Sequence, residues 1–453
     1  MLSSTKKHTP QLNLFTGLGD TLDQKHPLYI LSHKINWIIF EEAFKKHYSE
    51  KMGKPSKPIR LMVSLLILKY VRNLSDEALV EHWSENVYYQ YFSGEQYFQP
   101  TIPCVPTELV AFRQRIGTEG TELILKESIR VNDPGREDKD KKGNEEPKSI
   151  LSLDTTVQEK NITYPTDDKL AKKIIKKCWK IADKEHVKLR QSYVRTVKKV
   201  SQQQRFKNTK EGAATARKAN KKIKVIAGRL LRDLERKIPA ETQKSYMDHF
   251  RIFHKILMQK RGDTDKIYSL HEPDVKCYSK GKEHKKFEFG SKASILVEQT
   301  TGIIVGAINF TETLHDSKTV PKALDQYERL TGKTAKEVYV DRGYRGISEY
   351  KMTQINVPKP DKNITKTKKQ KHSRRAAIEP VIGHLKNEYR LCRNFLKGII
   401  GDNMNVILSA AAMNFKRVMN LWRTEEISSW QLSYIFNMLV MGFLFPKKLK
   451  MTF

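Results

Sequence analysis

Two apolar, strand-like runs of this chain each carry an aspartate at the end. "SILSLDTTV" contains Asp154, and "KEVYVDRGYRG" contains Asp341 just before a turn at Gly343. A carboxylate at the end of a buried strand is costly unless a positive charge meets it, and a divalent cation is the usual partner. Each aspartate taken alone is also compatible with a strand-end turn or a helix cap. Together the two runs predict a sheet whose strand ends bring acidic side chains to one place.

A third acidic position lies in "HSRRAAIEPVIGHLK", which has the pattern of a single helix. At about 100° per residue, four polar residues of this segment fall within an arc of about 60°. The apolar residues lie elsewhere around the helix, so the polar line is not simply its solvent side. A carboxylate flanked by cations suits a phosphodiester bound across a metal ion, whereas a solvated ion-pair face is the alternative. The four residues are His372, Arg375, Glu379 and Lys386.

The order of the predicted elements indicates an α/β protein with a ribonuclease-H-like core, which is a mixed sheet flanked by helices. After the strand with Asp154 and a long insertion, a β-hairpin turns at residues 300–302. A helix at about 316–330, the strand with Asp341 and the helix with Glu379 follow. This is the element order of that fold, in which the strand ends bring the two aspartates together and the late helix supplies the glutamate.

Composition and periodicity divide the chain into five parts. The first is helical, the second has no large apolar residue, and the fourth is basic and mainly helical and follows the first strand. The predicted parts are an N-terminal DNA-binding or dimerisation domain at 1–131, a charged linker at 132–148, a catalytic domain at 149–165 and 263–420, an insertion at 166–262, and a C-terminal helical tail at 421–453.

Several motifs resemble those of one known group of proteins. "SDEALVEHWSENVYYQYFSGE", "PTELVAFRQRIG", "YPTDDKL" and "FLKGIIGDNMNVILSAAAMNF" are similar to segments of the DDE transposases of bacterial insertion sequences, in particular insertion-sequence family five and its relative, family four. The signature of that group is Tyr, Arg, Glu and Lys with two, three and six intervening residues. Arg375, Glu379 and Lys386 match it, and His372 stands at the Tyr position.

The resemblance implies an enzyme whose catalytic residues Asp154, Asp341 and Glu379 hold two Mg²⁺ or Mn²⁺ ions. It implies a transposase that binds the ends of its insertion sequence, cleaves phosphodiester bonds and joins the 3′-hydroxyl ends to target DNA. The expected partners are double-stranded DNA, as terminal inverted repeats and as target, and a second copy of the chain in a homodimer on DNA. The expected location is the bacterial cytoplasm, at the nucleoid. A nuclease or resolvase without strand transfer, and an inactive DNA-binding descendant of a transposase, are the alternatives.

The charge of the chain supports nucleic acid as the substrate independently of this resemblance. The formal net charge is +33, and the segment from Thr166 to Arg261 holds 29 basic and 9 acidic residues. Such a surface neutralises phosphates, so binding is expected to weaken steeply with salt. Attachment to a membrane surface is the alternative, but no lipidation signal or long amphipathic helix accompanies the charge. The lysines selected as DNA-binding residues in the insertion are Lys172, Lys173, Lys176 and Lys177.

Further DNA-binding residues are expected at the catalytic helix and in the N-terminal domain. His372, Arg375 and Lys386 lie beside the predicted carboxylate, and Arg342 follows Asp341 directly. In "PTELVAFRQRIG", Thr107 is expected to cap a helix that ends at Gly117 and exposes two arginines, as in a helix-turn-helix. A dimerisation or scaffold bundle is the alternative for this domain. The two arginines are Arg113 and Arg115.

One more aspartate competes for a place among the acidic residues. Asp316 follows the third predicted strand and stands where a helix begins. It is interpreted first as an ordinary N-cap. The alternatives are a supporting, metal-orienting role for His315 and Asp316, and direct contact of Asp316 with the metal.

The cysteines and the chain ends add weaker constraints. The four cysteines are widely scattered without metal-ligand spacing, which indicates reduced thiols in a cytosol. The first residues lack the apolar core of a secretory signal. The most apolar stretch, at 434–445, is too short to span a bilayer and is interpreted as a packing helix or a contact between protomers.

Overall fold

A computed structural model describes residues 17–49, 55–132, 149–205, 208–260, 262–282, 285–358 and 365–444. The first 16 residues and nearly all of the predicted linker at 132–148 lie outside these ranges. The apolar stretch at 434–445 is described as helical backbone up to Leu444, and its side chains lie outside the description.

The N-terminal region is helical, as predicted. Its central helix α4 is buried on all sides because apolar residues surround it almost completely. Ser75 caps α5, its hydroxyl accepting a hydrogen bond from the Ala78 N–H (3.1 Å). The helices are α1 (Leu18–Thr21), α2 (Pro27–Lys34), α3 (Ile38–Lys45), α4 (Ile59–Val71), α5 (Asp76–Glu85), α6 (Val87–Phe92) and α7 (Pro106–Asn132).

Two expectations about α7 had different outcomes. Gly117 interrupts the helix with φ +61° and ψ −165°, so the predicted end at this residue is confirmed. The cap at Thr107 is wrong because the helix begins one residue earlier, at Pro106. The Val105 N–H instead donates to the carboxylate of Glu108 (3.1 Å), which satisfies the helix start.

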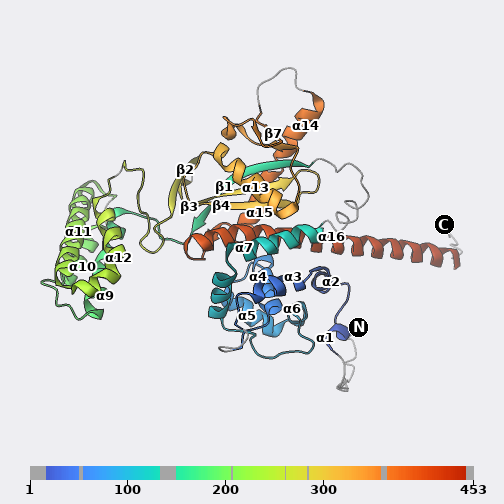
Figure 1. Ribbon diagram of the computed structural model, residues 1–453, viewed down its shortest axis with the longest axis horizontal. Helices are drawn as coiled ribbons and strands as arrows, with labels where there is room; N and C mark the ends of the chain where they lie inside the picture. Colours follow the sequence, from blue (N-terminus) through green and yellow to red (C-terminus); the bar gives the residue numbers. More distant parts are fainter. Residues whose placement is uncertain are drawn as a thin grey trace, which may run out of the picture.

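The basic insertion folds as a helical unit with its own hydrophobic core. Ile174, Ile223 and Phe253 are among the residues buried there, and this core is separate from that of the rest of the described chain. Figure 1 shows the unit standing to one side of the sheet, joined to it by two chain connections. Its helices are α9 (Asp167–Lys184), α10 (Val194–Gln203), α11 (Lys210–Lys237) and α12 (Ala240–Met258).

The strands form one mixed sheet. β1 lies in the middle of the sheet, is buried along most of its length, and pairs antiparallel with β3 and parallel with β5. The predicted hairpin is present as β3 and β4, with Gly302 at φ +71° in the turn. The order is β2-β3-β1-β5-β7-β6, and β4 pairs with β3 and β8 with β1. The bounds are β1 (Ile150–Lys160), β2 (Lys276–Lys282), β3 (Lys285–Glu298), β4 (Ile304–Phe310), β5 (Glu337–Tyr339), β6 (Glu349–Tyr350), β7 (Thr353–Asn356) and β8 (Arg393–Asn394).

Helices from the second half of the chain cover this sheet. The long α16 contacts both β4 and the N-terminal helices α4 and α7, so it joins the two regions into one continuous core. Figure 1 shows α16 running between them. These helices are α13 (Val320–Thr331), α14 (Lys366–Arg375), α15 (Ile378–Glu388) and α16 (Gly398–Leu444), with short 3₁₀ turns η1 (Asp316–Thr319) and η2 (Arg342–Tyr344). A mixed sheet flanked by helices, with a helical N-terminal region, confirms the predicted fold class.

Candidate active site

Three elements bring the predicted acidic residues together. Asp154 lies within β1, which continues to Lys160, so the predicted end of the strand at this aspartate is wrong. Asp341 follows β5, the parallel neighbour of β1. The carboxylate of Asp341 also caps η2, because its Oδ1 accepts a hydrogen bond from the Gly343 N–H (2.8 Å). Glu379 lies in the first turn of α15, which packs against β1. The two strands and the late helix therefore meet at one site, as the sequence predicted.

One guanidinium stands among these carboxylates. The Nη2 atom of Arg375 lies 2.9 Å from Oδ2 of Asp154 and 3.9 Å from Oδ2 of Asp341. Its Nη1 atom lies 3.8 Å from Oε1 of Glu379. The Nε atom of Arg375 is buried without a hydrogen-bond partner in the described part of the chain. A single cation thus faces three anions and keeps one donor available for a further acceptor, such as a phosphate oxygen.

The segment that carries Arg375 and Glu379 is not the single helix that the spacing predicted. It is divided into α14 and α15 at Ala376 and Ala377. Pro380 has no N–H to donate to the Ala376 carbonyl, and its ring crowds that carbonyl. The Glu379 N–H donates to the Ala376 oxygen instead (3.1 Å), which tightens the chain into a 3₁₀-type turn. Arg375 and Glu379 still lie on the same side.

The exposed fraction of the carboxylate side chains increases across the site. The side chain of Asp154 is 16% exposed, that of Asp341 41% and that of Glu379 67%. Burial raises the pKa of Asp154 to about 6, against the lowering effects of Arg375 and the Thr155 N–H. The charges of Asp341 and Asp316 raise the pKa of Asp154 further. This raised pKa indicates that the positive charge near the Asp154 carboxylate does not compensate for its burial.

The donor atoms of the site fit a hard divalent cation. All are carboxylate oxygens, which Mg²⁺ and Mn²⁺ prefer. Within the described ranges no three His, Cys, Asp or Glu side chains lie close enough together to hold one ion. The carboxylates are instead arranged around the guanidinium of Arg375.

Asp316 belongs to the same neighbourhood, and its interpretation as an N-cap is wrong. The residue that caps η1 is His315, whose Nδ1 accepts a hydrogen bond from the Ser317 N–H (3.4 Å). The carboxylate of Asp316 instead accepts a hydrogen bond from the Thr155 hydroxyl, next to Asp154. It also accepts one from Lys292 on β3. Sequence reasoning missed Thr155 and Lys292 because no local pattern links them to Asp316.

The remaining residues predicted around the catalytic helix lie close by. The His372 ring packs edge-on against Tyr339 of β5, with 4.8 Å between ring centroids. Burial, followed by the charge of Lys368, lowers the pKa of His372 below 6.5, which favours a neutral imidazole. Arg342 is exposed beside Asp341, and Lys386 is half-buried about two turns after Glu379. Their binding to DNA stays a prediction.

The N-terminal arginines differ from the prediction that both are exposed. Arg113 is buried, and its guanidinium donates two hydrogen bonds to Asp76 (2.8 and 2.6 Å). It is therefore held in the domain interior by a partner on α5. Arg115 is exposed as predicted, and its guanidinium lies 4.5 Å above the ring of Tyr48. Of the two, Arg115 alone can reach a DNA surface without rearrangement.

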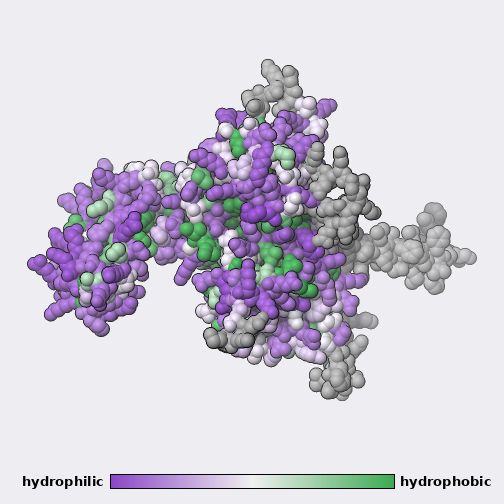
Figure 2. All heavy atoms as spheres, viewed as in Figure 1, coloured by the Kyte–Doolittle hydropathy of each residue, from purple (hydrophilic) through white to green (hydrophobic). Residues whose placement is uncertain are grey.

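The four selected lysines of the insertion lie on α9 in two environments. Lys172 donates to Gln204, and Lys173 donates to the Thr163 hydroxyl (3.0 Å). Lys176 and Lys177 are exposed. Figure 2 shows hydrophilic residues over most of the visible face of the insertion.

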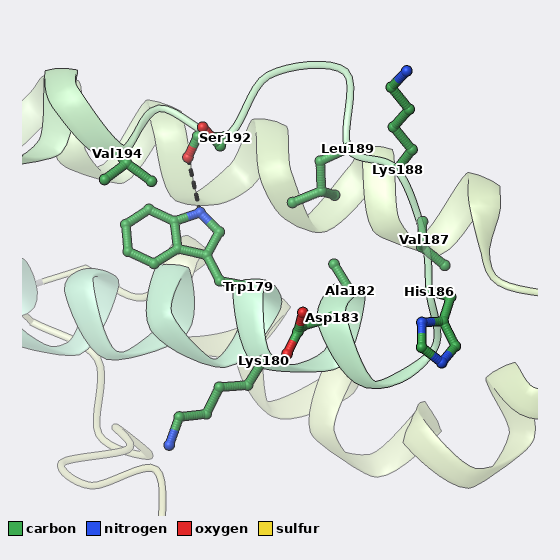
Figure 3. A pocket seen from close by; sticks show the side chains of 10 residues that line it. All are labelled: Trp179, Lys180, Ala182, Asp183, His186, Val187, Lys188, Leu189, Ser192 and Val194. Carbon is green, nitrogen blue, oxygen red and sulfur yellow. Dashed lines mark hydrogen bonds between the residues drawn. The ribbon is translucent and has the colours of Figure 1, made fainter.

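A cavity of about 700 Å³ lies between α9 and the segment that leads to α10. Figure 3 shows the Trp179 ring at this cavity, with its indole N–H donating to the Ser192 carbonyl (2.8 Å). Residues 179–194 of the insertion supply the whole lining. The cavity is therefore not part of the carboxylate site.

Comparisons with known proteins agree with this geometry. Residues 17–115 match the family model "Transposase domain (DUF772)", and residues 263–415 match "Transposase DDE domain". The second match includes Asp316, Asp341 and Glu379. The family matches, together with the fold, identify a DDE transposase, a metal-dependent enzyme that cleaves DNA.

The chain belongs to the DDE transposases of insertion sequences. It is also similar to the "Uncharacterized protein ORF8 in nfe locus" of Rhizobium meliloti, with 38% identity over 186 residues, which are 41% of this chain and 86% of that protein. No solved structure matches the chain significantly. Within the described residues, no helix has the length and apolar character needed to cross a membrane. Membership of insertion-sequence family five stays a prediction.

Proposed function

We propose that this transposase binds the ends of its insertion sequence, cleaves phosphodiester bonds with two divalent metal ions and joins the freed 3′-hydroxyl ends to target DNA. The observation that carries the proposal is the meeting of Asp154, Asp341 and Glu379 around Arg375. Four carboxylates, counting Asp316, face two cations, Arg375 and Lys292. Two divalent cations would offset the remaining negative charge of the carboxylates and leave positive charge to attract the phosphate.

Asp154, Asp341 and Glu379 would hold the ions, and Mg²⁺ or Mn²⁺ suits their oxygen donors. When bound, the ions supply Lewis-acid activation of the attacking and leaving oxygens. In the first reaction water attacks the phosphorus at the element end, and the bond to the 3′-oxygen breaks. In the second, this 3′-hydroxyl attacks a target phosphate and displaces a 3′-hydroxyl of the target strand.

The neighbouring cations would bind the phosphates. Arg375 has a buried Nε donor without a partner in the described ranges, which a phosphate oxygen would satisfy once the guanidinium moves from the carboxylates. Lys386 is predicted to bind a second phosphate, and Arg342 lies beside Asp341 on the surface. Positive charge around a phosphate stabilises the negative charge that develops in the transition state.

His372 and the two outer regions are proposed to hold the DNA. A neutral His372 ring, half-buried against Tyr339, suits stacking on a displaced base better than an ion pair with a phosphate. Arg115 and the exposed lysines Lys176 and Lys177 would bind the phosphates of a duplex. A homodimer on DNA, with one chain at each end of the element, completes the proposal.

The test is a cleavage and joining assay with the DNA that flanks the reading frame. Purified full-length chain is expected to bind these ends, cleave them with Mg²⁺ and join them to a target plasmid. Asp154→Ala, Asp341→Ala and Glu379→Ala should each abolish cleavage and retain end binding. Asp325→Ala is the matched control, because Asp325 lies on α13 and forms an exposed ion pair with Lys351.

Three results would count against the proposal in different ways. If one triad variant cleaves at the wild-type rate, that residue is misassigned. If the wild type cleaves without ever joining, the chain is a nuclease on the same fold. If it binds the ends but neither cleaves nor joins them with Mg²⁺ or Mn²⁺, it is an inactive descendant of a transposase.

A further inference from the structure

Asp316 is held in place by two donors on one of its oxygens. Its Oδ1 accepts hydrogen bonds from the Thr155 hydroxyl (2.9 Å) and from Nζ of Lys292 (2.8 Å). Nζ of Lys292 also donates to the Leu314 carbonyl (2.6 Å). Lys292 is mostly buried, so its side chain has little freedom. These bonds connect β1, β3 and η1 at the end of the sheet where Asp154 lies.

The second oxygen of Asp316 lies close to Gly343, as does one oxygen of Asp341. A β-carbon placed on Gly343 would lie 3.3 Å from Oδ2 of Asp316 and 3.0 Å from Oδ1 of Asp341. A side chain at residue 343 would therefore crowd both carboxylates. No hydrogen bond from the described residues reaches Oδ2 of Asp316. A free carboxylate oxygen thus stands near that of a predicted metal ligand.

Electrostatics argues that this pair of carboxylates faces a cation in the working enzyme. Like charges that lie close together destabilise each other unless positive charge lies between or beside them. Lys292 is bonded to the far oxygen of Asp316, and Arg375 lies nearest Asp154. Arg375 lies 3.9 Å from Oδ2 of Asp341, a looser contact than its 2.9 Å from Asp154.

We propose that Asp316 is a fourth acidic residue of the metal centre, which presents Oδ2 to the divalent cation beside Asp341. Lys292 and Thr155 are positioning residues, because they hold Oδ1 and so fix the direction of Oδ2. The inference rests on the proposed function, since it needs the metal centre to exist. It adds Asp316 to the three predicted metal ligands. It also assigns positioning roles to Lys292 and Thr155, which lie outside the transposase signature.

The experiment is a calorimetric titration of the metal-free, full-length protein with Mn²⁺. Asp316→Asn keeps the size and the Oδ1 acceptor but removes the charge, and a 10- to 100-fold loss of Mn²⁺ affinity is expected, as for other groups that support a metal site. Asp325→Asn is the matched control, because it removes the same charge from an exposed ion pair on α13. Its Mn²⁺ affinity should equal that of the wild type.

A second variant covers the case in which Asp316→Asn fails to fold. Thr155→Val removes one hydrogen bond to Oδ1 and leaves every charge in place, and a several-fold loss of affinity is expected. Wild-type affinity in a folded Asp316→Asn protein, or in Thr155→Val when the first variant cannot be tested, would overturn the inference. If the wild type binds no Mn²⁺ that depends on Asp154, the metal centre of the proposed function fails instead. The two failures are therefore distinguishable.

Discussion

Two charged clusters of this protein have opposite ratios of carboxylates to cations. In the N-terminal region one carboxylate, Asp76, lies between two cations, with 2.7 Å from Lys69 Nζ to Oδ1 and 2.6 Å from Arg113 Nη2 to Oδ2. In the catalytic site several carboxylates share one guanidinium at 2.9 to 3.9 Å. The first cluster has short, matched bonds and is buried, and the second is open to solvent at Glu379.

The pKa values of Asp76 and Asp154 are shifted in opposite directions in the two clusters. Burial alone would raise the pKa of Asp76, but the hydrogen bonds and charges of Arg113 and Lys69 lower it below its ordinary value. Burial raises the pKa of Asp154 to about 6 because the nearby cation is insufficient. The N-terminal cluster therefore has an excess of positive charge, and burial and the charge of Arg113 lower the pKa of Lys69 to about 8, whereas the catalytic site has an excess of negative charge that a cationic ligand could offset.

The largest effect on stability is expected at the N-terminal cluster. Asp76→Ala leaves Lys69 and Arg113 buried without their partner and should lower the free energy of unfolding by about 3 to 5 kcal/mol. Glu379→Ala, at the exposed end of the other cluster, should leave it nearly unchanged. Denaturant unfolding measures both. Equal effects of the two substitutions would remove the contrast between the clusters.

The second prediction concerns Asp154 in metal-free protein. Its folded-state pKa of about 6 lies above the ordinary value of 3.8, so the protonated form stabilises the fold. This contribution is complete below about pH 4 and is lost as the pH rises through 6. Asp154→Asn should therefore gain about 2 kcal/mol relative to wild type between pH 4 and pH 7.5, at about 1.4 kcal/mol per pKa unit. Unfolding in a chelator at both pH values checks this, and a pH-independent difference would show that Arg375 compensates the carboxylate fully.

The third prediction asks whether His372 acts through its ring. If it stacks on a displaced base, His372→Tyr should retain cleavage and His372→Ala should slow it by about 1 to 3 kcal/mol of activation energy. Single-turnover cleavage rates measure this step. If His372 instead acts as a cation beside phosphate, the rate falls as the pH rises through its pKa, and Tyr does not substitute. A wild-type rate for His372→Ala would leave packing against Tyr339 as the only role.

The smallest effect is expected on α9, where two lysine pairs provide their own control. Replacing the exposed Lys176 and Lys177 by Gln should weaken DNA binding at all sequences and reduce the log-log salt slope by roughly one unit for each phosphate that is no longer neutralised. The same change at Lys172 and Lys173, which donate to Gln204 and Thr163, should alter the slope less. Fluorescence anisotropy at several salt concentrations gives both slopes. Equal slopes for all three proteins would mean that this face does not touch DNA.

Short sequence patterns are sufficient to predict the positions of the aspartates and of the catalytic helix. Asp154 and Asp341 each follow an apolar strand run, and the parallel pairing of β1 with β5 places them together. The break before α15 is also encoded, by Pro380, although the polar spacing across it favours a continuous helix. The spacing still places Arg375 and Glu379 correctly on one side because a 3₁₀ turn changes their directions little.

Interactions between distant parts of the chain cannot be predicted in this way. Arg113 is buried because Asp76, 37 residues away on another helix, accepts its hydrogen bonds. Asp316 is turned from the helix end by Thr155, 161 residues before it, and by Lys292, 24 residues before it. Only the assembled sheet brings these groups within hydrogen-bond distance. One sequence contains no signal for such pairs.

The most direct test of the central claim, that the carboxylates hold the catalytic metal, is the metal preference of Asp341→Cys. A thiolate is a poor ligand for Mg²⁺ and a better one for the softer Mn²⁺. The variant should therefore bind end DNA normally, fail to cleave it with Mg²⁺ and recover part of the cleavage rate with Mn²⁺. Cleavage by Asp341→Cys with Mg²⁺ at the wild-type rate would contradict the claim that this side chain is a metal ligand.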